Sequence, residues 1–146
     1  MPETEELPAR LHTVLARLTR HLRQTRAGAE LTTTQYQVLA SVFRHGPMRH
    51  SDLAAHEGLN PTMLSRIVTK LETAGLVVRA PDVADGRAAR LSVSDRGRDL
   101  VERVKRERND ALSMALDRLG NDDLVALTGA LPVLESLAEA LREKPR

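Results

Sequence analysis

Residues 60–75 carry the side chains best suited to a chemical task. Their apolar members recur at the three- and four-residue spacing of a helix with one buried side: Leu64, Ile67, Val68 and Leu71. The opposite side of this helix would be a polar strip without acidic residues: Thr62, Ser65, Arg66, Thr69 and Lys70. Arginine, lysine and hydroxyl groups in one strip are the groups that contact phosphates and base edges of duplex DNA.

The members of this strip suit different parts of a DNA duplex. Arg66 can make a bidentate contact with guanine, whereas Thr62 and Ser65 can touch base edges or thymine methyl groups. Thr69 and Lys70 are better placed for phosphates. The alternative is that the strip is only the solvated side of a core helix, which is the commoner role of such a face.

The ends of this helix have the clearest signals in the chain. Asn60 is a favourable N-cap, Pro61 suits the first helical position, and the apolar pattern ends at Ala74 and Gly75. Asn60 could donate to a phosphate beside the helix N-terminus, so we include Asn60 and Pro61 among the predicted DNA-binding residues. A short helix at about 50–56, ended by Gly58, precedes it, and the pair is typical of a helix-turn-helix.

A two-stranded wing is predicted directly after this helix. Residues 76–79 and 90–93 favour strands, and Asp85 with Gly86 is a hairpin signal between them. Arg87 and Arg90 flank the turn, and the narrow minor groove of DNA attracts arginine. Asp85 would orient Arg87 through a salt bridge, although an exposed ion pair of little energetic value is an equal alternative.

Four further helices should position these elements. We expect a mainly α fold with a small two-stranded β wing, a winged helix-turn-helix lobe at 31–94 within a single domain of 1–146, and dimerisation helices at 5–28 and 95–142. One of Thr32, Thr33 and Thr34 should cap the second helix, and Ser94 or Asp95 the long fifth helix. The second helix should bury one stripe: Tyr36, Leu39, Ala40 and Phe43. The fifth should bury Leu100, Val101, Val104, Ala111, Leu112, Ala115 and Leu116.

The last helix carries a narrow apolar seam at alternating three- and four-residue spacing: Leu124, Leu127, Leu131, Leu134, Ala138 and Leu141. Such a seam is typical of a helix that packs against a partner, so we expect it to form a homodimer. Pro132 removes one helical hydrogen bond and predicts a kink or break just before it.

Composition excludes several classes of protein. The 41% hydrophobic and 29% charged residues are typical of an ordinary soluble chain, and no apolar run approaches the roughly 18 residues of a membrane span. The absence of cysteine excludes disulfides, thiolate metal sites and redox-sensing thiols. The acidic N-terminus lacks an export signal, which predicts a cytoplasmic location without membrane contact. Tyr36 and Phe43 are the only aromatic residues, which disfavours unpaired nucleic acid and leaves duplex DNA.

Two segments of the sequence resemble the MarR family: "LETAGLVVR" at 71–79 and "DGRAARLSVSDRGRDL" at 85–100. The resemblance covers nearly the whole chain and implies a homodimer with intertwined terminal helices, a recognition helix at 60–74, and a wing motif at Asp85 and Arg87. It also implies repression that a small aromatic or phenolic ligand relieves, with binding to a pseudo-palindromic operator. The candidate pocket residues are Leu15, Leu18, His21, Leu22, Tyr36, Leu39 and Phe43, each of which is otherwise an ordinary core position.

Three rival functions remain at this point. A metal-responsive regulator of the same fold would use His45, His50 and His56, but their spacing is unlike that of ligands on one helix face, so we expect no metal and no cofactor. A helical protein-interaction module would need only the apolar seam, which leaves the basic wing unexplained. An enzyme is not expected, because no nucleophile, base and orienting group form a recognisable motif.

Overall fold

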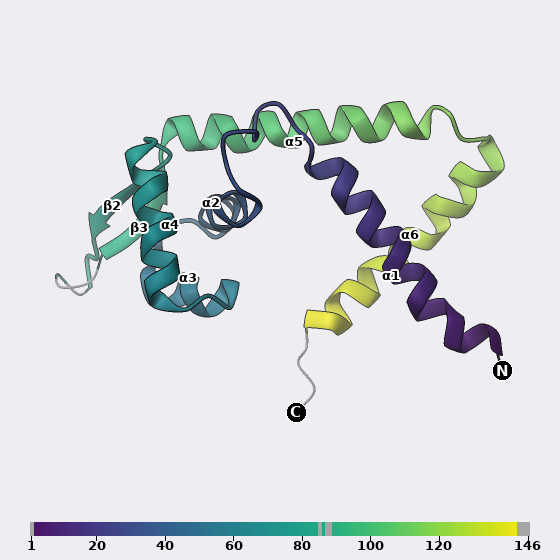
Figure 1. Ribbon diagram of the computed structural model, residues 1–146, viewed down its shortest axis with the longest axis horizontal. Helices are drawn as coiled ribbons and strands as arrows, with labels where there is room; N and C mark the ends of the chain where they lie inside the picture. Colours follow the sequence, from purple (N-terminus) through teal and green to yellow (C-terminus); the bar gives the residue numbers. More distant parts are fainter. Residues whose placement is uncertain (1, 85, 87–88, 143–146) are drawn as a thin grey trace. The chain divides into compact units, whose positions relative to one another are not determined.

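The computed structural model describes residues 2–84, 86 and 89–142, and their side chains from Glu6 onward. The chain divides into two compact units, Met1–Asn109 and Asp110–Arg146. The helices and strands that the structure describes follow in this order (Figure 1): α1 (Pro2–Arg23), α2 (Thr33–His45), β1 (Met48–Arg49), α3 (His50–Glu57), α4 (Pro61–Thr73), β2 (Val77–Pro81), β3 (Ala89–Val93), α5 (Asp95–Leu116) and α6 (Asn121–Arg142). The mainly helical fold class is confirmed.

Helix α2 supplies the centre of the core of the first unit. Thr32 is its N-cap and forms a reciprocal capping box with Gln35, as the three threonines predicted. The fully buried positions are Val38, Leu39 and Val42. The buried stripe is therefore rotated relative to the predicted one, because Tyr36 and Phe43 are only half-buried at its edges.

Helices α3 and α4 form the predicted helix-turn-helix. Gly58 ends α3 in the left-handed conformation, with φ of 63°, which glycine adopts without steric cost. Asn60 caps α4, and Pro61 occupies its first position, as predicted. The four predicted apolar positions of α4 are all buried in the core: Leu64, Ile67, Val68 and Leu71.

The sheet has three strands, in the order β1-β3-β2, where two were predicted. β2 and β3 pair antiparallel over five residues, from Val77 opposite Val93 to Pro81 opposite Ala89. The additional strand β1 is two residues long and pairs Met48 with Leu91 and Arg49 with Arg90. Because β1 directly precedes α3, it attaches the hairpin to the start of the helix-turn-helix.

Helix α5 begins where the sheet ends. The Ser94 hydroxyl accepts from the Gly97 N–H and donates to the Gly75 carbonyl, so Ser94 caps the helix and ties it to the end of α4. Leu100, Val101 and Val104 are buried, as predicted. The predicted burial of the later apolar positions is wrong for the single chain, because Ala111, Leu112 and Ala115 are exposed and Leu116 is half-buried.

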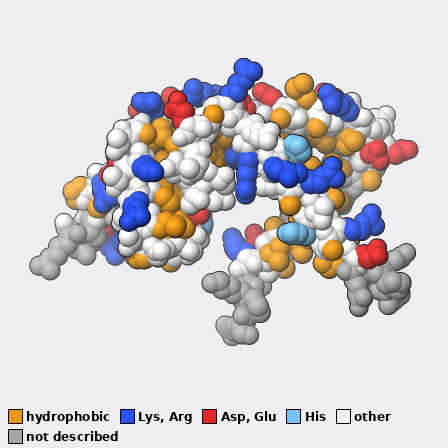
Figure 2. Space-filling model, in the orientation of Figure 1, with side chains coloured by type: hydrophobic (Ala, Val, Ile, Leu, Met, Phe, Trp, Pro, Cys, Tyr) orange, Lys and Arg blue, Asp and Glu red, His pale blue; other side chains and the backbone are white. Residues whose placement is uncertain are grey.

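Helix α6 continues from Asn121 to Arg142 through Pro132, so the chain does not break there, and a kink at Pro132 stays a prediction. Proline lacks a backbone N–H donor, but the residues on both sides of Pro132 belong to the same α-helix. None of the described α6 residues is buried, and apolar side chains lie at the surface, in orange in Figure 2. By length and composition α6 is apolar enough to cross a membrane, contrary to the sequence expectation, although such a feature in one helix is weak evidence for a span.

Candidate nucleic-acid interface and ligand cavity

The outer face of α4 presents the polar strip that the sequence predicted. Packing of the apolar side against α2 and α3 leaves all five strip residues exposed: Thr62, Ser65, Arg66, Thr69 and Lys70. The Ser65 hydroxyl lies 3.1 Å from Nε2 of His50, and the Thr69 hydroxyl donates to the Ser65 carbonyl at 2.8 Å. The strip is thus a polar surface held on a rigid helix, with Arg66 and Lys70 extending from it.

The start of α4 adds a residue that sequence analysis missed. The Asn60 carboxamide oxygen accepts from the Met63 N–H at 2.7 Å, so the Asn60 amide group remains oriented at the helix N-terminus. Met63 itself is 48% exposed and lines a shallow hollow together with Thr62 and Arg66. An apolar side chain beside polar ones suits the methyl group of thymine. The three- and four-residue spacing of α4 gave no signal for Met63, because Met63 is neither polar nor on the buried side of the helix.

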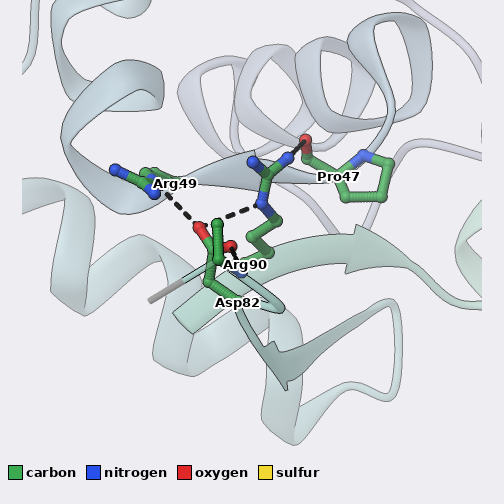
Figure 3. Close-up of polar contacts among 5 residues, drawn as sticks. Pro47, Arg49, Asp82 and Arg90 are labelled. Atoms are coloured by element: carbon green, nitrogen blue, oxygen red, sulfur yellow. Dashed lines mark hydrogen bonds and ion pairs between the residues drawn. The ribbon is translucent and has the colours of Figure 1, made fainter. Parts of the chain in front are cut away.

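At the turn end of the β2–β3 ladder, one carboxylate joins three parts of the lobe (Figure 3). Asp82 follows β2, and its side chain is only 2% exposed. Its Oδ2 accepts from Nε of Arg49 at 2.7 Å and lies 3.2 Å from Nε of Arg90, while its Oδ1 accepts from the Ala84 N–H at 2.9 Å. Arg90 also donates from Nη1 to the Pro47 carbonyl at 3.4 Å. We call the side chains of Asp82, Arg49 and Arg90 the wing bracket.

The wing bracket is electrostatically complementary. The hydrogen bond from the Ala84 N–H and those from Arg49 and Arg90 hold the pKa of the Asp82 carboxyl well below its usual range, so Asp82 is charged at neutral pH. Sequence analysis predicted that Arg90 contacts DNA and that Asp85 orients Arg87. Arg90 has two partners within the lobe, Asp82 and the Pro47 carbonyl, and its contact with DNA stays a prediction. Asp85 and Arg87 lie outside the described residues.

A cavity of about 480 Å³ lies within the first unit, lined by the end of α1, one side of α2, the end of α3 and α5. Of the seven predicted pocket residues, Leu22 and Tyr36 line it. Leu39 is fully buried in the core, and Phe43 lies under the charged groups of Arg98 and Lys105, each 5.5 Å from its ring centre. The other three predicted residues are exposed on α1: Leu15, Leu18 and His21.

The lining of this cavity is rich in positive charge. Arg23, Arg44 and Arg108 line it, and the Arg108 guanidinium lies 4.6 Å from the Tyr36 ring centre. Burial raises the pKa of the Tyr36 hydroxyl. The positive charges of Arg108 and Arg44 act in the opposite direction, but the effect of burial is larger. Nε of Arg108 is buried without a hydrogen-bond partner among the described residues. Sequence periodicity could not find these arginines, because they come from different helices.

An acidic residue also lines the cavity. Glu57, at the end of α3, accepts from the hydroxyl of buried Ser41 and lies 3.3 Å from Nδ1 of His56. The His56 ring meets the His45 ring edge-on, with 4.6 Å between ring centres, whereas His50 lies against Ser65. In the described part of the chain, no group of three or more histidine, cysteine, aspartate or glutamate side chains could hold a metal ion.

The order of elements and the exposed strip on α4 define a winged helix-turn-helix protein. The sequence model of the MarR family matches residues 31–89, which include the helix-turn-helix and most of the wing. Over this segment the chain is similar to the MarR family.

Curated relatives of the chain are named as transcriptional regulators. The chain is 29% identical over 133 residues to an uncharacterized HTH-type transcriptional regulator of Mycobacterium bovis, and the match covers 91% of this chain and 93% of the relative. It is 27% identical over 109 residues to the HTH-type transcriptional repressor MdtR of Bacillus subtilis, covering 75% and 70%. The crystal structure of a Thermotoga maritima transcriptional regulator shares its fold, with a TM-score of 0.80, 23% identity and coverage of 97% and 99%.

Proposed function

We propose that this protein is a cytoplasmic, homodimeric repressor that binds a pseudo-palindromic operator in duplex DNA and releases it when a small aromatic or phenolic ligand binds. The observation that carries the proposal is the acid-free strip of α4, all of which is exposed on a helix that the core holds rigidly. The B. subtilis relative, which is named as a repressor, supports repression as the outcome of DNA binding.

The geometry of α4 suits the major groove. A helix of 13 residues is about 20 Å long and fits this groove, where all four base pairs are distinguishable. Arg66 would read guanine and Met63 a thymine methyl group, while Lys70 and Thr69 would contact phosphates. The β2–β3 hairpin lies beside α4 and would reach the neighbouring minor groove, where Arg87 and Arg90 are the candidate contacts.

A second copy of the chain is the partner that the exposed apolar seam of α6 requires. Leu127, Leu131 and Leu141 are 40%, 49% and 76% exposed in the single chain. Apolar area of this extent on a helix is characteristic of an interface, since it is costly to leave in water. A dimer would also place two α4 helices on successive major grooves of one face of DNA, about 34 Å apart.

The cavity supports a ligand that carries negative charge as well as an aromatic ring. Three arginines and one glutamate line it, so an aromatic carboxylate or phenolate would find more attraction than repulsion. A ligand there would contact α1, α2, α3 and α5 at once. If the ligand favours a dimer in which the distance between the two α4 helices no longer matches that between the major grooves, ligand binding weakens DNA binding.

DNA binding is tested first by a gel-shift experiment. The purified protein is titrated against the intergenic DNA upstream of its own gene and against a scrambled duplex, at two salt concentrations. We expect a preferential shift that weakens steeply with salt, because phosphate contacts release counterions. Equal binding to both duplexes, followed by equal binding throughout a pool of random duplexes, would exclude a sequence-specific regulator.

The ligand is tested with 4-hydroxybenzoate and benzoate as probes of the proposed class. Each should raise the melting temperature of the protein and weaken operator binding, and Arg108→Gln should reduce both effects. Reciprocity requires operator DNA to weaken probe binding by the same factor. Probe binding that is unchanged by saturating operator would contradict the proposed coupling. Addition of zinc with the same readouts tests the rival metal-responsive regulator.

A further inference from the structure

The wing bracket lies where the hairpin pairs with β1, the strand that precedes α3. The β1–β3 ladder has two residue pairs, Met48 with Leu91 and Arg49 with Arg90, so it is a short attachment. Asp82 adds ion pairs to the same two arginines, one on each strand. Figure 3 shows the Asp82 carboxylate between the two guanidinium groups. The carboxylate therefore joins the end of β2, the strand β3 and the N-cap residue of α3.

The presence of an acid at this place needs an explanation beyond folding of the hairpin. Five residue pairs already hold β2 and β3 together, and Asp82 lies beyond the last of them. A negative charge on a DNA-binding lobe also repels phosphates, so by electrostatics alone its removal should strengthen binding. A buried carboxylate with two arginine partners fixes the orientation of both guanidinium groups.

We propose that Asp82 is a positioning residue for DNA binding, which locks the wing to the helix-turn-helix so that both engage the duplex as one rigid body. The proposal rests on the proposed function. Arg49 connects Asp82 to the N-terminus of α3, and Arg90 connects Asp82 to β3 within the wing. With the bracket lost, the hairpin ladder and the core remain, but the wing is no longer held at a fixed angle to α4.

The test compares Asp82→Asn with Asp52→Asn. Asparagine keeps the shape of Asp82 and removes its charge, and Asp52 is an exposed acid on α3 in the same lobe. Asp82→Asn should weaken operator binding by about tenfold, the factor that corresponds to loss of one charge-assisted hydrogen bond. Asp52→Asn should leave affinity unchanged or increase it, because it only removes a repulsive charge. Circular dichroism and melting curves establish that both variants are folded.

Hydroxyl-radical footprinting separates positioning from a general loss of structure. At saturating protein, Asp82→Asn should lose protection of the minor-groove flanks where the wing binds and keep protection of the major-groove centre where α4 binds. Arg49→Gln, which breaks the bracket from the side of α3, should give the same footprint. Arg49→Gln replaces Asp82→Asn in this test if the Asp82→Asn protein does not fold.

The outcomes are distinct. A wild-type protein that protects no duplex would contradict the proposed function itself. A wild-type footprint that both bracket variants reproduce in full, with unchanged or higher affinity, would overturn only the role of Asp82. A uniform loss of protection at the flanks and the centre would also overturn it, since that result indicates a structural defect in the whole lobe.

Discussion

Arg66 and Lys70 lie one helical turn apart on the exposed side of α4, yet the two charges differ in what they can recognise. The planar guanidinium can form two parallel hydrogen bonds with guanine, whereas the ammonium group acts as a point charge. Arg66→Ala should therefore lower affinity for the operator by about 1–3 kcal/mol and change binding to scrambled duplex much less. Fluorescence anisotropy titrations on both duplexes measure this difference.

Lys70→Ala is the matched comparison on the same helix. It should weaken binding to operator and scrambled duplex alike and reduce the slope of log affinity against log salt by about one. If the two variants lose operator and scrambled binding in the same proportion, then the distinction between base and phosphate contacts on α4 is wrong. Both residues are exposed, so neither change should alter the melting temperature appreciably.

At the scale of elements, the packing of α5 on the sheet depends on Gly97. A Cβ built at Gly97 would lie 2.1 Å from the Leu76 carbonyl oxygen and 2.8 Å from Cγ2 of Val93. Gly97→Ala should therefore displace the first turn of α5 and lower the free energy of unfolding by about 1–3 kcal/mol or more. Urea denaturation followed by circular dichroism measures the change.

Gly129→Ala is the control for the helical preference of alanine. Gly129 lies within α6, and nothing lies within 4 Å of a Cβ at this position. Alanine is the better helix former, so this change should raise stability by about 0.5–1 kcal/mol. Equal effects of the two substitutions would mean that Gly97 is not in close contact with the sheet.

Elements with strong local signals could be predicted from the sequence. Helix α4 has a cap at Asn60, a proline at its first position and a regular apolar side, and each of these acts within a few residues. Strand β1 could not be predicted in this way, because two residues are too few to show alternation. It forms only because β3 lies beside it in the folded chain.

The wing bracket and the cavity were missed for the same reason. Asp82 follows a strand in a polar segment, and its burial depends on arginines 33 residues before it and 8 residues after it in the chain. The cavity likewise takes Arg23, Arg44 and Arg108 from three helices. Spacing within one element could predict which side of a helix is exposed, but not which charges the fold brings together.

At the scale of the whole molecule, the single chain leaves a large apolar area without a partner. The α6 seam and the apolar positions of α1, including Leu7 and Val14 at 61% and 51% exposure, face solvent in one copy. These are the first and last helices of the chain, so the proposed dimerisation through them would explain both the exposed seam and the apolar composition of α6. The same composition would not be needed in a monomeric regulator.

Replacement of Leu127 and Leu131 by aspartate tests this explanation. Both side chains lie on the seam, and burial of two charges without partners in an apolar interface is strongly unfavourable. The double variant should sediment as a monomer, and its operator affinity should fall to that of a single half-site. Analytical ultracentrifugation and gel shifts on full and half operators measure the two effects.

Ser136→Asp is the control on the same helix. Ser136 follows Leu127 by nine residues and therefore lies on the opposite side of α6, because each residue turns the helix by about 100°. This variant should remain a dimer with unchanged operator affinity. A Leu127→Asp/Leu131→Asp protein that stays dimeric and binds the full operator normally would place the interface elsewhere. A monomer that still binds the full operator as tightly would instead separate dimerisation from DNA recognition, because two linked half-sites then provide no advantage over one.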